Sequence, residues 1–138
     1  MKKFILILTV LCTSLSFEAN AQHDYSLDFD LFVIALGLDD KDGAAKYFET
    51  DSSFASNKWQ IFEDEFIQSI SQYNYSDCTD SFIAGVKVKE LIMEYSFPFT
   101  DSDGATTTIT RVTYVYFKET KNGLVLEEIF NPEGTDAP

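Results

Sequence analysis

The chain has 138 residues, the length of one ordinary domain, and 45% of them are hydrophobic, which is enough to form a substantial core. Acidic residues outnumber basic ones by 23 to 10, and the formal net charge is −13. This charge excludes nucleic acids and anionic membrane surfaces as expected partners, because both attract Lys and Arg. It suits a soluble surface, or a basic partner protein that the charge steers toward it.

The N-terminus predicts a cleaved signal peptide over residues 1–21. Two lysines begin it, an apolar run follows over residues 4–15, and Ala19-Asn20-Ala21 supplies the small residues that signal peptidase accepts. The apolar run is too short for a good membrane span. We therefore expect cleavage after Ala21 and an exported mature chain, periplasmic or secreted, that keeps no membrane anchor.

Cleavage would remove Cys12 and leave Cys78 as the one cysteine of the mature chain. A single thiol forms no internal disulfide. Asp77 and Asp80 flank Cys78, and nearby carboxylates disfavour the thiolate on which cysteine reactivity depends. We expect an unreactive, buried thiol.

The first half of the mature chain is predicted to be helical. Three helices are expected, over residues 27–38 with Gly37 near the end, over 44–49 with Asp42 as a cap, and over 57–73. The helical spacing of the first, very apolar segment comes from Leu27, Leu31, Ile34, Ala35 and Leu38. The apolar stripe of the third consists of Trp59, Phe62, Phe66, Ile70 and Tyr73.

The second half alternates as β-strands do. Strands are predicted to begin within residues 82–88 and to run over 89–100, 106–118 and 124–131, and Asn122-Gly123 is a strong hairpin signal between the last two. Helices followed by an antiparallel meander predict an α+β fold, with N-terminal helices packed on a curved antiparallel sheet. We assign one domain to residues 22–131 and a flexible tail to 132–138.

The predicted register of the sheet comes from its turns. A two-residue turn at Asn122-Gly123 pairs Phe117 with Glu128, and one register of the preceding turn places Glu94 opposite Arg111. With this register, residues can be assigned to the two faces of the sheet, because successive side chains of a strand point to opposite faces. The face assigned to the helix-covered core holds Leu91, Met93, Tyr95, Phe97, Val112, Tyr114, Tyr116, Val125 and Ile129.

The other face is mixed, with apolar and charged residues side by side. It holds Glu90, Ile92, Glu94, Arg111, Val115, Phe117, Leu126, Glu128 and Phe130. This face is too apolar for a free surface, because contiguous exposed apolar patches usually mark contact sites, and its charges would give the contact specificity. In the alternative, the assignment is inverted, and the mixed face lines an internal pocket with Arg111 and the glutamates as its polar groups.

Two stretches are similar to elements of a known family: residues 42–48 followed by Asp51 and Phe54, and the hairpin of residues 111–118 and 122–127. With the helix-then-sheet order, they make residues 27–130 resemble the nuclear-transport-factor-2-like (NTF2-like) superfamily, a cone-shaped, cystatin-like α+β fold. The family includes isomerases, dehydratases and non-catalytic binding modules, so the resemblance leaves function open. It implies pairing through the sheet, and a pocket between sheet and helices for a small apolar ligand. The expected pocket residues are Trp59, Tyr95, Tyr114 and Tyr116.

No catalytic, cofactor or metal-binding set is predicted. His23, the only histidine, would follow the cleavage site closely, where we expect a solvated terminal side chain. Asp-x-Asp-Gly occurs at residues 40–43 and 101–104. However, Leu38 and Phe99 occupy the positions where a calcium loop needs an earlier ligand, so both stretches predict turns.

These expectations lead to two hypotheses. The first is an exported, non-enzymatic binding module whose mixed face contacts a second copy of itself, as a homodimer, or a basic protein. A periplasmic immunity protein that blocks a basic toxin is one concrete version. The second is a small-ligand-binding protein, or an isomerase- or dehydratase-type enzyme, that uses the pocket. It would use Glu90 or Glu94 as base and Tyr114 or Tyr116 as proton donor.

Overall fold

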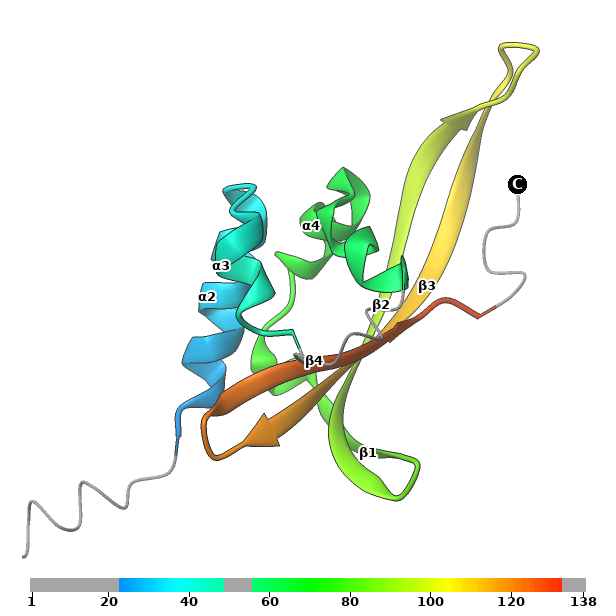
Figure 1. Ribbon diagram of the computed structural model, residues 1–138. Coiled ribbons are helices and arrows are strands. Elements are labelled where there is room, and N and C mark those ends of the chain that lie inside the picture. The colour runs from blue at the N-terminus through cyan, green and yellow to red at the C-terminus, as the bar shows by residue number, and fades with distance from the viewer. Residues whose placement is uncertain (1–22, 49–55, 133–138) are drawn as a thin grey trace, which may run out of the picture.

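The computed structural model describes residues 23–48 and 56–132, in which helices precede an open antiparallel sheet (Figure 1). The helices are α2 (Tyr25–Gly37), α3 (Lys41–Ala45) and α4 (Asp64–Ile70), with the short 3-10 helices η1 (Ser56–Phe62) and η2 (Tyr75–Asp77). The strands are β1 (Thr79–Ile83), β2 (Val86–Thr100), β3 (Thr106–Thr120) and β4 (Gly123–Phe130), in the spatial order β1-β2-β3-β4. This architecture confirms the α+β prediction. The predicted signal peptide, Asp51, Phe54 and the tail from residue 133 lie outside the described residues.

Helix α2 closes the core over the sheet. Its N-cap, Asp24, accepts a hydrogen bond from the backbone N–H of Leu27 at 3.1 Å, which satisfies one of the free donors of the first turn. Phe29 and Phe32 then project toward β3, and their ring centroids lie 5.7 and 5.9 Å from that of Phe117, in edge-to-face contact. All three rings are fully buried. The core is therefore centred between α2 and β3.

The aliphatic spacing that predicted this helix lies on its other side. Leu27, Leu31, Ile34 and Leu38 are 52%, 45%, 55% and 75% exposed. The helix is present where the sequence predicts it, but apolar residues extend around most of its circumference. Periodicity therefore does not identify the buried side of such a helix, and here the aromatic side is the buried one.

The third predicted helix is broken into two. η1 ends at Phe62, Glu63 has an extended backbone (φ −72°, ψ 137°), and α4 begins after it. The break lets Ile61 and Phe66 both reach the core, where each is at most 1% exposed. Five residues along a continuous helix would separate them by more than a third of a turn. Trp59, expected in the apolar stripe, is instead 53% exposed.

The β3–β4 hairpin turns one residue earlier than predicted, so that Thr120 pairs with Gly123. Gly123 has a φ of +134°, where L side chains are strained. A Cβ at this position would also lie 2.9 Å from Oδ2 of Asp28 in α2. The positive φ therefore favours glycine at the first residue of β4, and the Asp28 carboxylate lies close to the space that a Cβ would fill.

Both predicted strand registers are wrong. In the β3–β4 pair, Phe117 faces Leu126 instead of Glu128, and a bulge lies just before Phe117. In the β2–β3 pair, Glu94 faces Val112, one residue from its predicted partner. A shift of one residue turns every side chain of a strand to the other face of the sheet. Strand β3 is therefore inverted relative to the prediction, whereas β2 is oriented as predicted.

The inner face of the sheet, under the helices, carries side chains that are at most 2% exposed: Leu91, Met93, Val115, Phe117, Leu126 and Ile129. Val115, Phe117 and Leu126 were predicted for the partner face, and that prediction is wrong because they form the core. The opposite, outer face carries three residues of β3 that were predicted for the core: Val112, Tyr114 and Tyr116.

Candidate functional site

One face of the sheet, the outer face, is turned away from the helices (Figure 1). It carries an apolar row across three strands. Ile92 of β2 pairs with Tyr114 of β3, and Tyr114 pairs with Phe130 of β4. Ile92 and Phe130 are each 48% exposed, and the ring centroids of Tyr114 and Phe130 lie 6.2 Å apart. These three residues, the apolar row, are as large as the core residues but remain open to solvent.

Carboxylates border the apolar row on both sides. In the next row along the strands, Tyr116 lies between Glu90 and Glu128. Burial, the hydrogen bond to Glu90 and the charges of Glu90 and Glu128 together raise the pKa of Tyr116 to about 12. On the other side of the apolar row, Glu94 pairs with Val112. The outer face therefore has an apolar centre and a negative rim.

Several of the predicted partner-face residues do meet on this outer face: Glu90, Ile92, Glu94, Glu128 and Phe130. Arg111 does not join them. It lies on the inner side of β3, where its guanidinium carbon is 5.1 Å from the ring centroid of Phe97 and its Nη1 is 3.4 Å from Glu63. Tyr114 belongs to the outer face but was missed, because the register error assigned it to the core.

The four predicted pocket residues do not come together. Tyr114 and Tyr116 lie on the outer face, and Trp59 is exposed beside Phe62 on η1. A groove of about 350 Å³ does lie between α4 and β2, and Tyr95 is the one predicted pocket residue that lines it. The inverted assignment also fails in part, since the glutamates that it placed inside a pocket are on the outer face.

A chain of hydrogen bonds joins the inner side of the sheet to η1. The Thr113 hydroxyl donates to Oδ1 of Asn131 at 2.6 Å, and the Tyr95 hydroxyl lies 3.3 Å from the same Thr113 oxygen. Asn131 in turn donates from Nδ2 to Oε1 of Gln60 at 2.7 Å. Thr113 is 1% exposed, so these bonds satisfy a buried hydroxyl. The chain of bonds holds the end of β4 against the helices.

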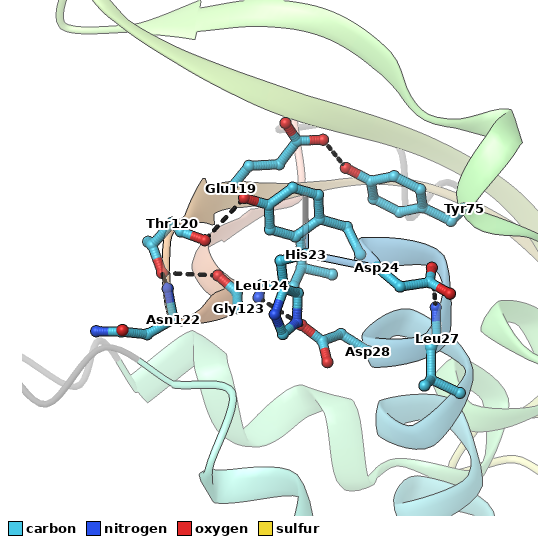
Figure 2. Close-up of polar contacts among 11 residues, drawn as sticks. His23, Asp24, Leu27, Asp28, Tyr75, Glu119, Thr120, Asn122, Gly123 and Leu124 are labelled. Carbon is cyan, nitrogen blue, oxygen red and sulfur yellow. Dashed lines mark hydrogen bonds and ion pairs between the residues drawn. The ribbon is translucent and has the colours of Figure 1, made fainter. Parts of the chain in front are cut away.

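His23 is exposed, as predicted, and its side chain also contacts helix α2 near the β3–β4 hairpin (Figure 2). Its Nε2 lies 2.7 Å from Oδ2 of Asp28, and the same oxygen accepts a hydrogen bond from the backbone N–H of Leu124 at 2.8 Å. The Tyr25 hydroxyl donates to the carbonyl oxygen of Thr120 at 2.8 Å. These contacts fasten the first turn of α2 to the hairpin.

Cys78 is half-buried and forms no disulfide. Burial raises the pKa of its thiol to about 12, with Lys89 opposing the shift and Asp77 and Glu119 adding to it. The thiol is therefore protonated at neutral pH, which agrees with the predicted lack of reactivity.

Within residues 23–48 and 56–132, His, Cys, Asp and Glu side chains form no group of three or more that could hold a metal ion. The helices in this part of the chain are too short or too polar to span a membrane. Comparisons of the chain with protein-family models, curated proteins and solved structures give no match. The candidate site is therefore defined by the geometry of the outer face.

Proposed function

We propose that the protein is an exported, non-enzymatic binding module whose outer sheet face docks a basic partner protein. The observation that carries the proposal is the apolar row of Ile92, Tyr114 and Phe130, which is half-open to solvent within a rim of carboxylates. Contiguous exposed apolar patches usually mark contact sites. Aromatic residues at the centre of a face, with charges around them, are the usual composition of an interface.

Charge favours a basic partner over a second copy of this chain. Packing two outer faces together would bring Glu90, Glu94 and Glu128 of one copy near the same carboxylates of the other. Lys118, which pairs with Val125 at one end of this face, leaves most of that repulsion in place. A basic partner would instead gain attraction at the rim, and the net charge of −13 would speed its approach.

The setting of this activity is part of the proposal. The signal-like N-terminus supports export to the periplasm or beyond. Helices that precede a curved antiparallel sheet support an NTF2-like architecture, in which pairing through the sheet is common. A periplasmic immunity protein that inhibits a basic toxin is one concrete form of such a module.

Site-specific photo-cross-linking tests the proposal. A photoreactive phenylalanine derivative replaces Tyr114 in residues 22–138, and the control carries it at Asp30, an exposed position on α2. We expect a basic protein from extracts of the source cells to cross-link at position 114 and not at position 30. The yield should fall from roughly 0.05 M to roughly 0.5 M salt, because rim charges are screened.

Two outcomes would overturn the proposal. Cross-linking of the chain to itself at position 114, with the mass of a dimer in light scattering, would identify a second copy as the occupant. Equal cross-linking at positions 114 and 30 would show that the outer face selects no partner. Ile92→Asp is the loss-of-function variant for this experiment, because it places a charge in the apolar row without touching the core.

A further inference from the structure

One edge of β2 is open over much of its length. Within the described residues, β1 pairs only with the segment Val86–Glu90 on that edge, whereas β3 pairs with β2 as far as Thr100 on the other edge. Beyond Glu90, the strand continues past β1 alongside α4 (Figure 1). Over this stretch β2 is an edge strand, and the backbone groups on that edge form no ladder with another described strand.

The backbone groups that point to the open edge can be identified. In an antiparallel pair, successive residues direct their N–H and C=O groups to opposite edges of the strand. The N–H of Glu94 points away from β3, because it donates to the Tyr73 hydroxyl at 3.4 Å. Ser96 and Pro98, two and four residues further along, therefore point the same way. Ser96 offers both an N–H and a C=O there, and Pro98 offers only a C=O.

A groove runs between this open edge and α4. Its volume is about 350 Å³, within the roughly 300–1,000 Å³ that is usual for binding sites. Its lining residues are Asp64, Glu65, Gln68, Ser69 and Gln72 from the helical side, and Tyr95, Ser96, Phe97 and Pro98 from β2. Four successive residues of β2 line it, so the groove follows the edge of the strand rather than one face of the sheet.

The two walls of the groove differ in chemistry. The helical wall carries the exposed carboxylates of Asp64 and Glu65. The strand wall carries the rings of Tyr95 and Phe97, whose centroids are 6.3 Å apart. Arg111 already places its guanidinium over Phe97, so the carboxylates of Asp64 and Glu65 are the groups that favour positive charge in the groove. The groove therefore suits a segment with an extended backbone and positively charged side chains.

We propose that a short, basic, extended segment of another protein binds in this groove by adding to the open edge of β2 as a further strand. Backbone hydrogen bonds to Ser96 and Pro98 would hold the segment, and Asp64 and Glu65 would select its positive charge. Pro98 lacks an N–H, which keeps the added ladder short and disfavours pairing of this edge with a long strand. This site is separate from the outer face, and the proposal does not depend on what that face binds.

The probe is a capped peptide of about seven residues in which arginine and valine alternate, added to isotope-labelled residues 22–138. We expect the peptide to shift the amide resonances of α4 and of β2 near Ser96. We also expect slower hydrogen exchange of the Ser96 N–H, because the peptide would accept its hydrogen bond. A peptide with glutamate in place of arginine should not bind, and N-methylation of alternate backbone amides should weaken binding by about tenfold or more.

Two substitutions at Ser96 isolate the backbone contribution. Ser96→Pro removes the outward N–H, and Ser96→Ala keeps it, while both remove the 2.8 Å hydrogen bond between the Ser96 and Thr110 hydroxyls. We expect Ser96→Pro to weaken the arginine–valine peptide by about tenfold or more, and Ser96→Ala by less than about twofold. Equal weakening by the two substitutions would overturn strand addition.

A second pair of substitutions covers the case in which Ser96→Pro does not fold. Asp64→Asn combined with Glu65→Gln removes the charge of the helical wall and should weaken the peptide by about tenfold. Unchanged affinity in this double variant would overturn the proposal, as would peptide-induced shifts centred on Tyr114 and Phe130. Ile92→Asp should leave peptide binding intact, so failure of the groove and failure of the outer face are distinguished.

Discussion

Phe117 and Phe130 both project from the sheet, but in opposite directions. Phe117, on the inner face of β3, is fully buried against Phe29 and Phe32 of α2. Phe130, on the outer face of β4, is 48% exposed beside Tyr114. The strands place large apolar residues on both faces, and the helices cover one of them. An aromatic strand residue is therefore a core residue only where another element brings a matching surface to it.

The largest expected effect comes from placing a charge on each face of β2. Leu91 is 1% exposed and Ile92 is 48% exposed, although they are neighbours in the chain. We expect Leu91→Asp to abolish folding, because burying an unpaired carboxylate costs as much as a domain's entire stability of about 5–15 kcal/mol. Ile92→Asp should keep a cooperative urea transition. Circular dichroism of both variants checks this, and an unfolded Ile92→Asp protein would mean that the outer face is core.

Truncation of the two phenylalanines gives the next largest difference. Phe117→Ala should lower the free energy of unfolding by about 3–5 kcal/mol, because it leaves a cavity between α2 and β3. Phe130→Ala should lower it by less than about 1 kcal/mol, since its ring is half-exposed. Urea denaturation of the two variants measures both values. Similar losses would contradict the division of the sheet into a buried and an open face.

Hydroxyl groups on the two faces give a smaller difference. Thr113→Val should lower the free energy of unfolding by about 1–3 kcal/mol, because Asn131 and Tyr95 lose a buried hydrogen-bonding partner. Thr110→Val, at an exposed position of the same strand, is the control and should change stability by less than about 0.5 kcal/mol. The same denaturation measurements apply, and an effect at Thr110 as large as that at Thr113 would refute the structural role of the inner bonds.

The smallest effect is electrostatic. The pKa of Tyr116 is raised from 10.0 to about 12 by burial and then by Glu90 and Glu128. Because the folded protein favours the protonated phenol, the contribution of Tyr116 to stability is fully present below about pH 10. It is lost as the pH rises through about 12. Glu90→Gln should lower this pKa part of the way toward 10.0, measured from the resonance of a labelled Tyr116 ring. An unchanged pKa would show that the rim does not act on the tyrosine.

Local signals in the sequence place the elements well. The alternation of β2 and β3, the hairpin near Asn122 and the helical spacing of α2 depend on neighbours in the chain, and the α+β architecture follows from their order. The faces of those elements depend on distant residues. The turn before β4 contains Gly123, whose positive φ favours glycine and which lies beside the Asp28 carboxylate of α2. The bulge before Phe117 then shifts the register again. Neither the approach of Asp28 nor the bulge can be predicted from the alternation of residues along a strand.

For the candidate site as well, the features that depend on neighbours in the chain were predicted, and those that depend on distant residues were not. Glu90, Ile92 and Glu94 were placed correctly because they share a strand whose orientation the pattern predicted. Tyr114 was misplaced because its face depends on the β2–β3 register, in which a one-residue change reverses it. The groove beside Ser96 was not foreseen, since it depends on β1 beginning only at Thr79, opposite Glu90, and on α4 beginning after the break at Glu63.

The hydrogen bond between Asp28 and Leu124 joins residues 96 positions apart in the chain. Asp28 is synthesised early and Leu124 late, and Phe29 likewise meets Phe117 only when β3 exists. Helix α2 therefore has no core to cover while the ribosome is still producing the sheet. We therefore expect folding to wait until β4 has been made, because contacts of such long sequence separation are slow to form. Such a delay would be compatible with the export that we propose, because the chain would still be unfolded when it crossed the membrane.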